Sequence, residues 1–236
     1  SRGLGDVYKR QEYTQVAMVT ACIAMTRAVE AMGLHADMTA GLSLGEYCAI
    51  AAAGGMCDMD AVRTVRSRGI FMEHAAPEGT GAMSAVLGLD ASVIEEVLDG
   101  REGVSIANYN CPGQIVITGQ AEAVAKAGEA LKEAGARRVL PLKVSGPFHS
   151  PMMRPAGEEL AKVFAGVSMN PLKLPYVANI NAEVITDCSK IEELLVAQVS
   201  GSVRWQQSVE TMIREGVDTF IAVSYTHLRA HETDQY

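Results

Sequence analysis

Residues 41–45 read Gly-Leu-Ser-Leu-Gly, which is a G-x-S-x-G pentapeptide. This pattern is typical of a serine on a tight turn between a strand and a helix, where the hydroxyl is open to a substrate carbonyl and a base. Segment 35–40 could be a short buried strand, and the small apolar segment 47–53 could be a helix. The sequence therefore predicts Ser43 as a nucleophile. The alternative interpretation is a glycine-rich packing turn with an inert serine.

The residue after this serine could stabilise an oxyanion. A helix that begins beside Ser43 directs unsatisfied N–H groups and a partial positive charge toward its surroundings. The N–H of Leu44 is therefore a candidate donor to the oxyanion that forms when an acyl group is attacked.

An arginine interrupts an apolar helix face further along the chain. On the helix predicted at 59–75, helical spacing places Ala61, Val65, Arg68 and Met72 on one face. A permanent cation there is costly unless an anion meets it, so Arg68 could bind a substrate carboxylate through two hydrogen bonds. Two other interpretations stay open. Arg68 could form an internal ion pair with a core acid, or its aliphatic part could be buried while its guanidinium reaches water.

His149 is the candidate base. It follows a strand predicted at 138–144 and precedes Ser150-Pro151, which are typical of a helix start. The positive end of that helix should disfavour the imidazolium and keep the ring a usable base. Ligands also bind at the strand ends of parallel sheets. The alternative is a purely structural histidine.

The elements that must position these residues indicate an α/β fold. We expect a hydrolase-like core at 12–77 and 146–223, with a mostly parallel sheet covered on both faces. The core elements are predicted as a helix at 12–34 that stops near Gly33, helices at 151–167, 191–199 and 203–215, and buried strands at 176–179 and 220–223.

Between the two halves of this core, the order of elements is βαββαβ, which predicts an inserted ferredoxin-like subdomain at 78–145. The expected strands are 82–89, 104–109, 114–118 and 138–144, and the expected helices are 91–98 and 121–134.

Both ends of the chain lack hydrophobic periodicity. We interpret 1–11 as a non-native leader and 224–236 as a non-native tail, and exclude both from fold reasoning, including His227 and His231 as ligands. A pair of disordered native tails is the alternative.

Composition limits the class of protein. The 236 residues carry a net charge of −8 and are 48% hydrophobic, which supports a full globular core and argues against a nucleic-acid partner. The longest apolar run ends at Arg27 and is too short to span a bilayer. The five cysteines have scattered spacings without a zinc pattern, so we expect reduced thiols in a cytoplasmic protein.

Four motifs stand together in one order. They are Gly-Leu-Ser-Leu-Gly-Glu-Tyr around Ser43, Arg68-Gly69 with Phe71-Met72, Asn108-Tyr109-Asn110-Cys111-Pro112-Gly113-Gln114, and Gly146-Pro147-Phe148-His149-Ser150. Over about residues 12–223 the chain resembles the malonyl-CoA:acyl carrier protein transacylases of bacterial fatty-acid synthesis.

This resemblance implies Ser43 as nucleophile, His149 as its base and Arg68 as the clamp on the malonyl carboxylate. It implies that the main-chain carbonyl of Gln198 orients the histidine. Further positions are implied to line the cleft: Asn110, Met72 and Phe148, of which Phe148 resembles the malonyl-selective form of its motif.

The resemblance also implies ping-pong transfer of malonyl from malonyl-CoA to the thiol of acyl carrier protein, without a metal or redox cofactor. We expect a monomeric cytoplasmic enzyme with no membrane partner. Because acyl carrier protein is usually acidic, docking needs a basic patch, for which the candidates are Lys132, Arg137, Arg138 and Lys143.

The chain departs from the family at Leu42, where histidine is common, and at Glu73, where glutamine is common. The family's second oxyanion donor would lie before residue 12. Two rival hypotheses follow: a serine esterase or thioesterase, which would need a carboxylate partner for His149, and a catalytically impaired fragment.

Overall fold

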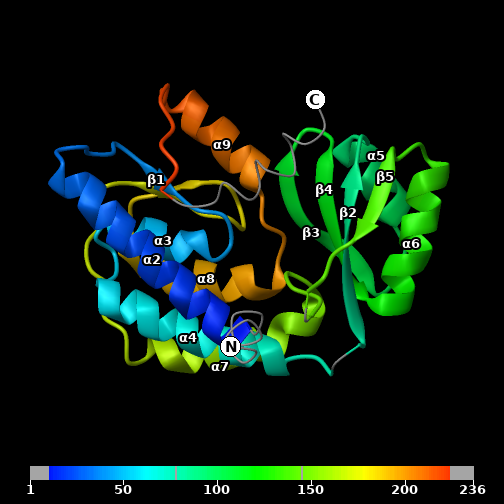
Figure 1. The fold of residues 1–236 in the computed structure, drawn as a ribbon, viewed down its shortest axis with the longest axis horizontal. Helices are drawn as coiled ribbons and strands as arrows, with labels where there is room; N and C mark the ends of the chain where they lie inside the picture. The colour runs from blue at the N-terminus through cyan, green and yellow to red at the C-terminus, as the bar shows by residue number, and fades with distance from the viewer. Residues whose placement is uncertain (1–10, 78, 145, 224–236) are drawn as a thin grey trace, which may run out of the picture.

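The computed structural model describes residues 11–77, 79–144 and 146–223. Figure 1 shows a mainly helical core on one side and an antiparallel sheet covered by helices on the other. The predicted leader and tail fall mainly on residues 1–10 and 224–236, and the predicted domain junctions on residues 78 and 145. All of these lie outside the described residues.

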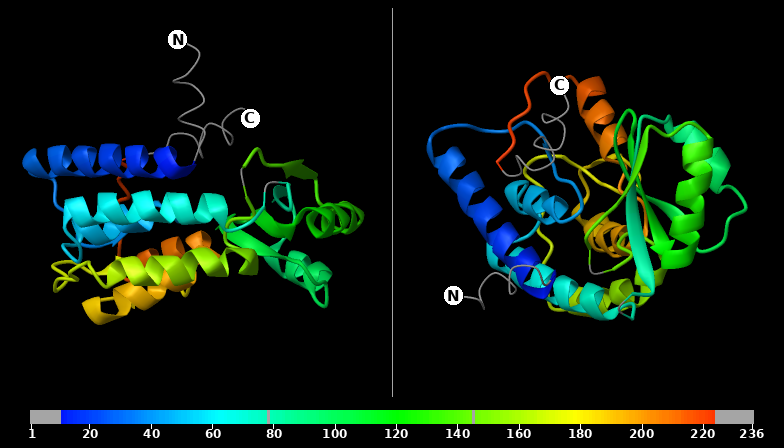
Figure 2. Two further views of the ribbon diagram at one scale, coloured as in Figure 1. Left: turned by 90° about the horizontal axis from the view of Figure 1, so that it is seen from below. Right: turned by 45° about the vertical axis from the view of Figure 1, so that its right-hand side comes forward.

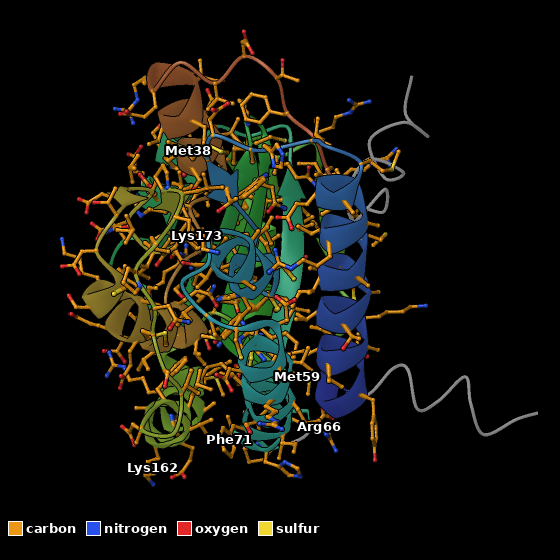
Figure 3. All side chains as sticks on the ribbon, turned by 90° about the vertical axis from the view of Figure 1, so that its left-hand side faces the viewer. Met38, Met59, Arg66, Phe71, Lys162 and Lys173 are labelled. Atoms are coloured by element: carbon orange, nitrogen blue, oxygen red, sulfur yellow. The ribbon has the colours of Figure 1, made fainter. Side chains whose placement is uncertain are left out.

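Two long helices form one side of the core. Helix α2 (Gln11–Ala31) packs along helix α4 (Asp58–His74), and Figure 3 shows α2 at the right of the view with α4 beside it. The predicted stop of α2 is confirmed: Gly33 has a φ of +90°, and its N–H bonds back to the carbonyl of Glu30. Across the helix pair, Arg66 of α4 lies 4.6 Å from the ring centroid of Tyr13.

The core sheet is smaller than the sequence predicted. It consists of β1 (Thr39–Ala40), β6 (Tyr176–Val177) and β7 (Val184–Ile185), in the order β1-β6-β7. Only the β1–β6 pair is parallel, because β7 returns antiparallel to β6. The α/β class is confirmed, but within the described residues a single parallel pair replaces the expected, mostly parallel sheet.

The remaining core helices surround this sheet. They are α3 (Gly45–Ala52), α7 (Arg154–Phe164), α8 (Ile191–Ser200) and α9 (Trp205–Arg214), with short 3₁₀ turns η1 (Pro151–Met153) and η2 (Cys188–Lys190). The helix predicted at 151–167 thus begins as a 3₁₀ turn.

The buried strand predicted at 220–223 is wrong. Residues 220–223 form no strand, and the side chains of Phe220 and Ile221 are 50% and 57% exposed. No described strand pairs with this segment, so its backbone groups have no ladder to complete.

The ferredoxin-like arrangement is confirmed. The elements are β2 (Gly81–Leu87), α5 (Ala91–Leu98), β3 (Val104–Cys111), β4 (Gln114–Gln120), α6 (Ala121–Glu133) and β5 (Arg138–Pro141). The strands pair antiparallel in the order β3-β4-β2-β5, and Figure 2 shows the helices on the face away from the core.

The other face of this sheet is joined to the core. Met83, Ala107 and Val116 belong to the same buried cluster as the core helices. At the edge strand β3, the N–H of Val203 donates to the carbonyl of Ala107 at 2.7 Å, and the N–H of Tyr109 donates to the carbonyl of Val203 at 2.9 Å. These contacts fix the subdomain against the chain that links α8 to α9.

Among the described helices, none has both the length and the apolar character needed to cross a membrane.

Candidate active site

The turn that carries Ser43 lies between β1 and α3, as the pentapeptide predicted. Ser43 has a φ of +50°, a left-handed conformation that a serine adopts only when its surroundings impose it. A Cβ added to Gly41 would lie 2.1 Å from main-chain atoms of Gly45, whereas one added to Gly45 would meet nothing within 4 Å. The close approach of the backbone therefore requires the first glycine of the motif and not the second.

Asn179 holds this turn from the neighbouring strand. It lies two residues after the end of β6 and is buried; its Oδ1 accepts from the N–H of Ser43 at 2.6 Å and its Nδ2 donates to the carbonyl of Gly41 at 2.8 Å. Sequence reasoning missed this residue. The available signal was a polar side chain at the end of the buried strand predicted at 176–179.

Ser43 and His149 meet, as predicted. The Oγ of Ser43 lies 2.7 Å from the Nε2 of His149, and the Nδ1 of His149 lies 2.8 Å from the main-chain carbonyl oxygen of Gln198. Because a carbonyl can only accept, Nδ1 carries the proton and Nε2 presents its lone pair to the serine hydroxyl. These distances are those that the predicted base, His149, and the histidine-orienting carbonyl that the resemblance implied for Gln198 would require; the roles themselves stay predictions.

Burial and a nearby cation keep the imidazole neutral. His149 is 5% exposed, and burial, followed by the positive charge of Arg68, lowers its pKa to about 4. The expected direction is confirmed. The cause differs from the predicted positive end of the following helix: desolvation comes first and the charge of Arg68 second.

Arg68 reaches the same point from α4. Its side chain is buried; Nη1 donates to the Oε1 of Gln15 at 2.7 Å, and Nη2 donates to the Oγ of Ser43 and to the Oε1 of Gln198, both at 3.2 Å. Its Nε has no hydrogen-bond partner among the described residues.

No Asp or Glu of the described residues forms an ion pair with Arg68. This excludes the interpretation of an ion pair with any described core acid. Because Arg68 is buried, its guanidinium does not reach water either. Desolvation lowers the pKa of the guanidinium, which nevertheless stays charged at neutral pH. The guanidinium is hydrogen-bonded to neutral amides and an alcohol, its central carbon lies 5.7 Å from the ring centroid of Tyr47, and the buried carboxyl of Glu46 lies nearby without forming an ion pair with it. This arrangement favours an anionic ligand.

A buried acid, Glu46, connects these groups and was not predicted. Its Oε2 accepts from the Nε2 of Gln198 at 2.6 Å and from the N–H of Asn179 at 3.3 Å, while the same Nε2 donates to the carbonyl of Ser43 at 2.9 Å. Burial raises the pKa of Glu46 to about 8. The sequence signal was an acid at the start of an otherwise small and apolar helix.

The N–H of Leu44 is positioned for an oxyanion. Leu44 precedes the first residue of α3, and its N–H donates to no acceptor among the described residues. The second donor, which the resemblance placed before residue 12, lies outside the described residues.

Three predicted cleft positions differ in their relation to the site. Met72 is buried and its Sδ accepts from the Nε2 of Gln15, so it lies beside the amide that holds Arg68. Phe148 is buried in the core cluster next to His149. Asn110 is half-buried on β3 and forms no hydrogen bond with the site among the described residues. Its role stays a prediction.

Chemically, an alcohol, a neutral imidazole and an unpaired guanidinium within hydrogen-bonding distance can perform nucleophilic acyl transfer from a substrate that carries an anionic group.

Comparison with known proteins agrees with this chemistry. The family model described as "Acyl transferase domain" matches residues 6–233. The chain is 46% identical over 213 residues to the malonyl CoA-acyl carrier protein transacylase of Bacillus subtilis (strain 168), covering 89% of this chain and 67% of that protein.

Solved structures give the same result. The chain superposes on a crystal structure of MCAT from Streptococcus pneumoniae with a TM-score of 0.92 at 40% identity, over 99% of this chain and 77% of that one. A malonyl-transacylase in complex with a type II PKS acyl-carrier protein matches with a TM-score of 0.90 at 37% identity, over 100% and 77% of the two chains. The chain belongs to the acyl transferase domain family.

We predict that Gly41→Ala disables the turn. The new Cβ would lie 2.1 Å from the Gly45 main chain, so the turn must shift and move Ser43 away from His149. We expect a loss of about 1–3 kcal/mol in the free energy of unfolding and a drop of about 100-fold in the labelling of Ser43 by a fluorophosphonate.

Gly45→Ala is the matched control. Open space surrounds that position, so the substitution should leave labelling unchanged and stabilise the helix by up to about 1 kcal/mol. Equal labelling of both variants would show that the close contact at Gly41 does not position the serine.

The lowered pKa of His149 predicts a flat pH profile. A base with a pKa of about 4 is almost fully neutral from pH 5 to pH 7, so the labelling rate of Ser43 should stay constant across that range. A histidine with an ordinary pKa near 6.5 would instead lose roughly 25-fold in rate on going from pH 7 to pH 5. An inflection near pH 6.5 that disappears in His149→Ala would contradict the buried, neutral ring.

Proposed function

We propose that this chain transfers a malonyl group from malonyl-CoA to the phosphopantetheine thiol of acyl carrier protein through a malonyl ester on Ser43. The observation that carries the proposal is the unpaired Arg68 guanidinium beside Ser43 and His149. The similarity to malonyl CoA-acyl carrier protein transacylases supports it independently.

The length of the acyl group fits this geometry. In a malonyl ester, the carboxylate carbon is three bonds from the serine oxygen, and bonds of about 1.5 Å limit that separation to about 4 Å. The Nη2 of Arg68 lies 3.2 Å from the Oγ of Ser43. The carboxylate of a three-carbon diacid can therefore reach the guanidinium, where it would replace the contact with the serine.

In the first half-reaction, the Oγ of Ser43 attacks the thioester carbon while its proton passes to the Nε2 of His149. The N–H of Leu44 donates to the oxyanion of the tetrahedral intermediate. When the intermediate collapses, the carbon–sulfur bond breaks and CoA leaves with the proton from Nε2.

In the second half-reaction, His149 takes the proton of the incoming thiol, and the thiolate attacks the malonyl ester. Ser43 leaves as the alcohol after its oxygen recovers that proton, so no net proton is consumed. The solved complex of a related malonyl-transacylase with an acyl-carrier protein supports this choice of acceptor.

The partner of His149 favours transfer to a thiol over hydrolysis. Its Nδ1 faces the carbonyl of Gln198, whereas a hydrolase of the rival type would place a carboxylate there. A carbonyl stabilises the imidazolium less, so the ring is a weak base. A weak base can activate a thiol more readily than water, because the pKa of a thiol is far lower than that of water.

Docking of the carrier at a basic patch stays a prediction. The candidates Lys132, Arg137, Arg138 and Lys143 are all exposed, and Lys132 pairs with Glu129 at 2.7 Å. A cytoplasmic location is part of the proposal. It is supported by the five cysteines, none of which forms a disulfide in the described part of the chain.

The proposal predicts a covalent intermediate. Incubation with malonyl-CoA in the absence of an acceptor should add one malonyl group to the peptide that contains Ser43, as detected by mass spectrometry, and Ser43→Ala should acquire none. Addition of holo acyl carrier protein should then remove the group as malonyl-carrier. Release of free malonate faster than transfer to the carrier would favour the hydrolase, and an adduct that no thiol removes would favour the impaired fragment.

Arg68→Ala should reverse the selectivity between acyl groups. An acetyl group leaves the guanidinium without a partner, while a malonyl group satisfies it, so removal of the cation should lower kcat/KM for malonyl-CoA by about 100-fold or more and spare acetyl-CoA. Arg63→Ala, an exposed position on the same helix, is the control and should change neither value. Equal losses for both substrates in Arg68→Ala would argue against the clamp.

A further inference from the structure

Glu46 is a buried carboxyl group that the reaction itself does not use. It lies in the first turn of α3 and its side chain is 0% exposed. Its Oε2 accepts two hydrogen bonds, from the Nε2 of Gln198 at 2.6 Å and from the N–H of Asn179 at 3.3 Å. Its Oε1 has no partner among the described residues.

Both hydrogen-bond partners of Glu46 hold the reacting groups. Gln198 contacts the Nδ1 of His149 through its main-chain carbonyl, the carbonyl of Ser43 through Nε2, and Arg68 through Oε1.

The side chain of Asn179 hydrogen-bonds to the same turn, through the N–H of Ser43 and the carbonyl of Gly41. A single carboxyl oxygen therefore orients both residues that fix the nucleophile, the base and the cation.

We propose that Glu46 is a positioning residue, which orients the amide of Gln198 and the backbone of Asn179 so that His149, Ser43 and Arg68 keep their productive geometry. This inference rests on the proposed function for its reaction, although the contacts that carry it are independent of the substrate.

The protonation state of Glu46 matters for the cation. Burial raises the pKa of Glu46 to about 8, so it is neutral at pH 7. The charged and titratable groups around it are Arg68 on α4, Tyr47 on α3 and Tyr176 on β6, with His149 beyond Gln198. Burial raises the pKa of both tyrosines above the ordinary value, so neither ionises before Glu46.

A neutral Glu46 does not compete for Arg68, which stays available to the substrate carboxylate. When the pH rises above about 8, Glu46 becomes an anion close enough to interact with the guanidinium. The negative charge of Glu46 then opposes the binding of the malonyl carboxylate at Arg68. We therefore expect the KM for malonyl-CoA to rise between pH 7 and pH 9, while the KM for acetyl-CoA stays constant.

Two substitutions test this role. Glu46→Ala removes the acceptor and should lower kcat for malonyl transfer about 10–100-fold, the usual effect of losing a residue that orients a reacting group. Glu46→Gln keeps an acceptor oxygen but cannot ionise. It should retain most of the kcat at pH 7 and lose the rise in KM above pH 8.

Thr64→Val is the matched control. Thr64 is equally buried, lies on α4, and its hydroxyl has no partner among the described residues, so this nearly isosteric change should alter neither kcat nor the pH profile. Thermal melting and circular dichroism establish that each variant is folded at the assay temperature. If Glu46→Ala does not fold, the KM profile of Glu46→Gln decides alone.

The inference is overturned if folded Glu46→Ala transfers malonyl at the wild-type rate, or if Glu46→Gln keeps the alkaline rise in KM. A wild-type protein that forms no malonyl ester on Ser43 at any pH would instead defeat the proposed function. The two failures are therefore distinguishable in the same set of assays.

Discussion

The guanidinium of Arg68 is only 2% exposed, and no described carboxylate neutralises it. A buried cation is stable only when polar groups surround it, and here these groups are the amides of Gln15 and Gln198 and the hydroxyl of Ser43. The same charge contributes to keeping His149 neutral. The cation thus helps, after burial, to keep the base neutral, and in the proposed function it selects the kind of acyl group that binds beside the nucleophile.

Much of the fold was predictable because its elements have strong local periodicity. The strands of the antiparallel subdomain are short runs whose central residues are buried, because helices cover one face and the core covers the other. Gly88, Gly103 and Gly113 lie in the turns between these elements, so their order was predictable from the sequence. The core sheet was not predictable to the same degree. Its strands β1 and β6 are two residues long, and their pairing depends on contacts between segments far apart in the chain. The apolar segment at 220–223 shows that hydrophobicity without a pairing partner does not make a strand.

The candidate site divides in the same way. Ser43, Arg68 and His149 were predictable because each breaks a local rule, as a serine on a strained turn, a cation on an apolar face, and a histidine before a helix start. Glu46 and Asn179 were missed because their roles exist only after folding brings α3, β6 and α8 together. Residues such as Arg68 can be found from the sequence because they differ from their local surroundings. Glu46 and Asn179, which orient them, can be found only from hydrogen bonds between distant parts of the chain.

The central claim is that Arg68 receives the carboxylate of an acyl group carried by Ser43. A crystal structure of the protein after reaction with malonyl-CoA tests this most directly. We expect an ester on the Oγ of Ser43, with its terminal carboxylate hydrogen-bonded to the guanidinium of Arg68 and the contact between Arg68 and the serine oxygen broken. An ester whose carboxylate points to solvent, with Arg68 still bound to Gln15 and Gln198 alone, would contradict the account.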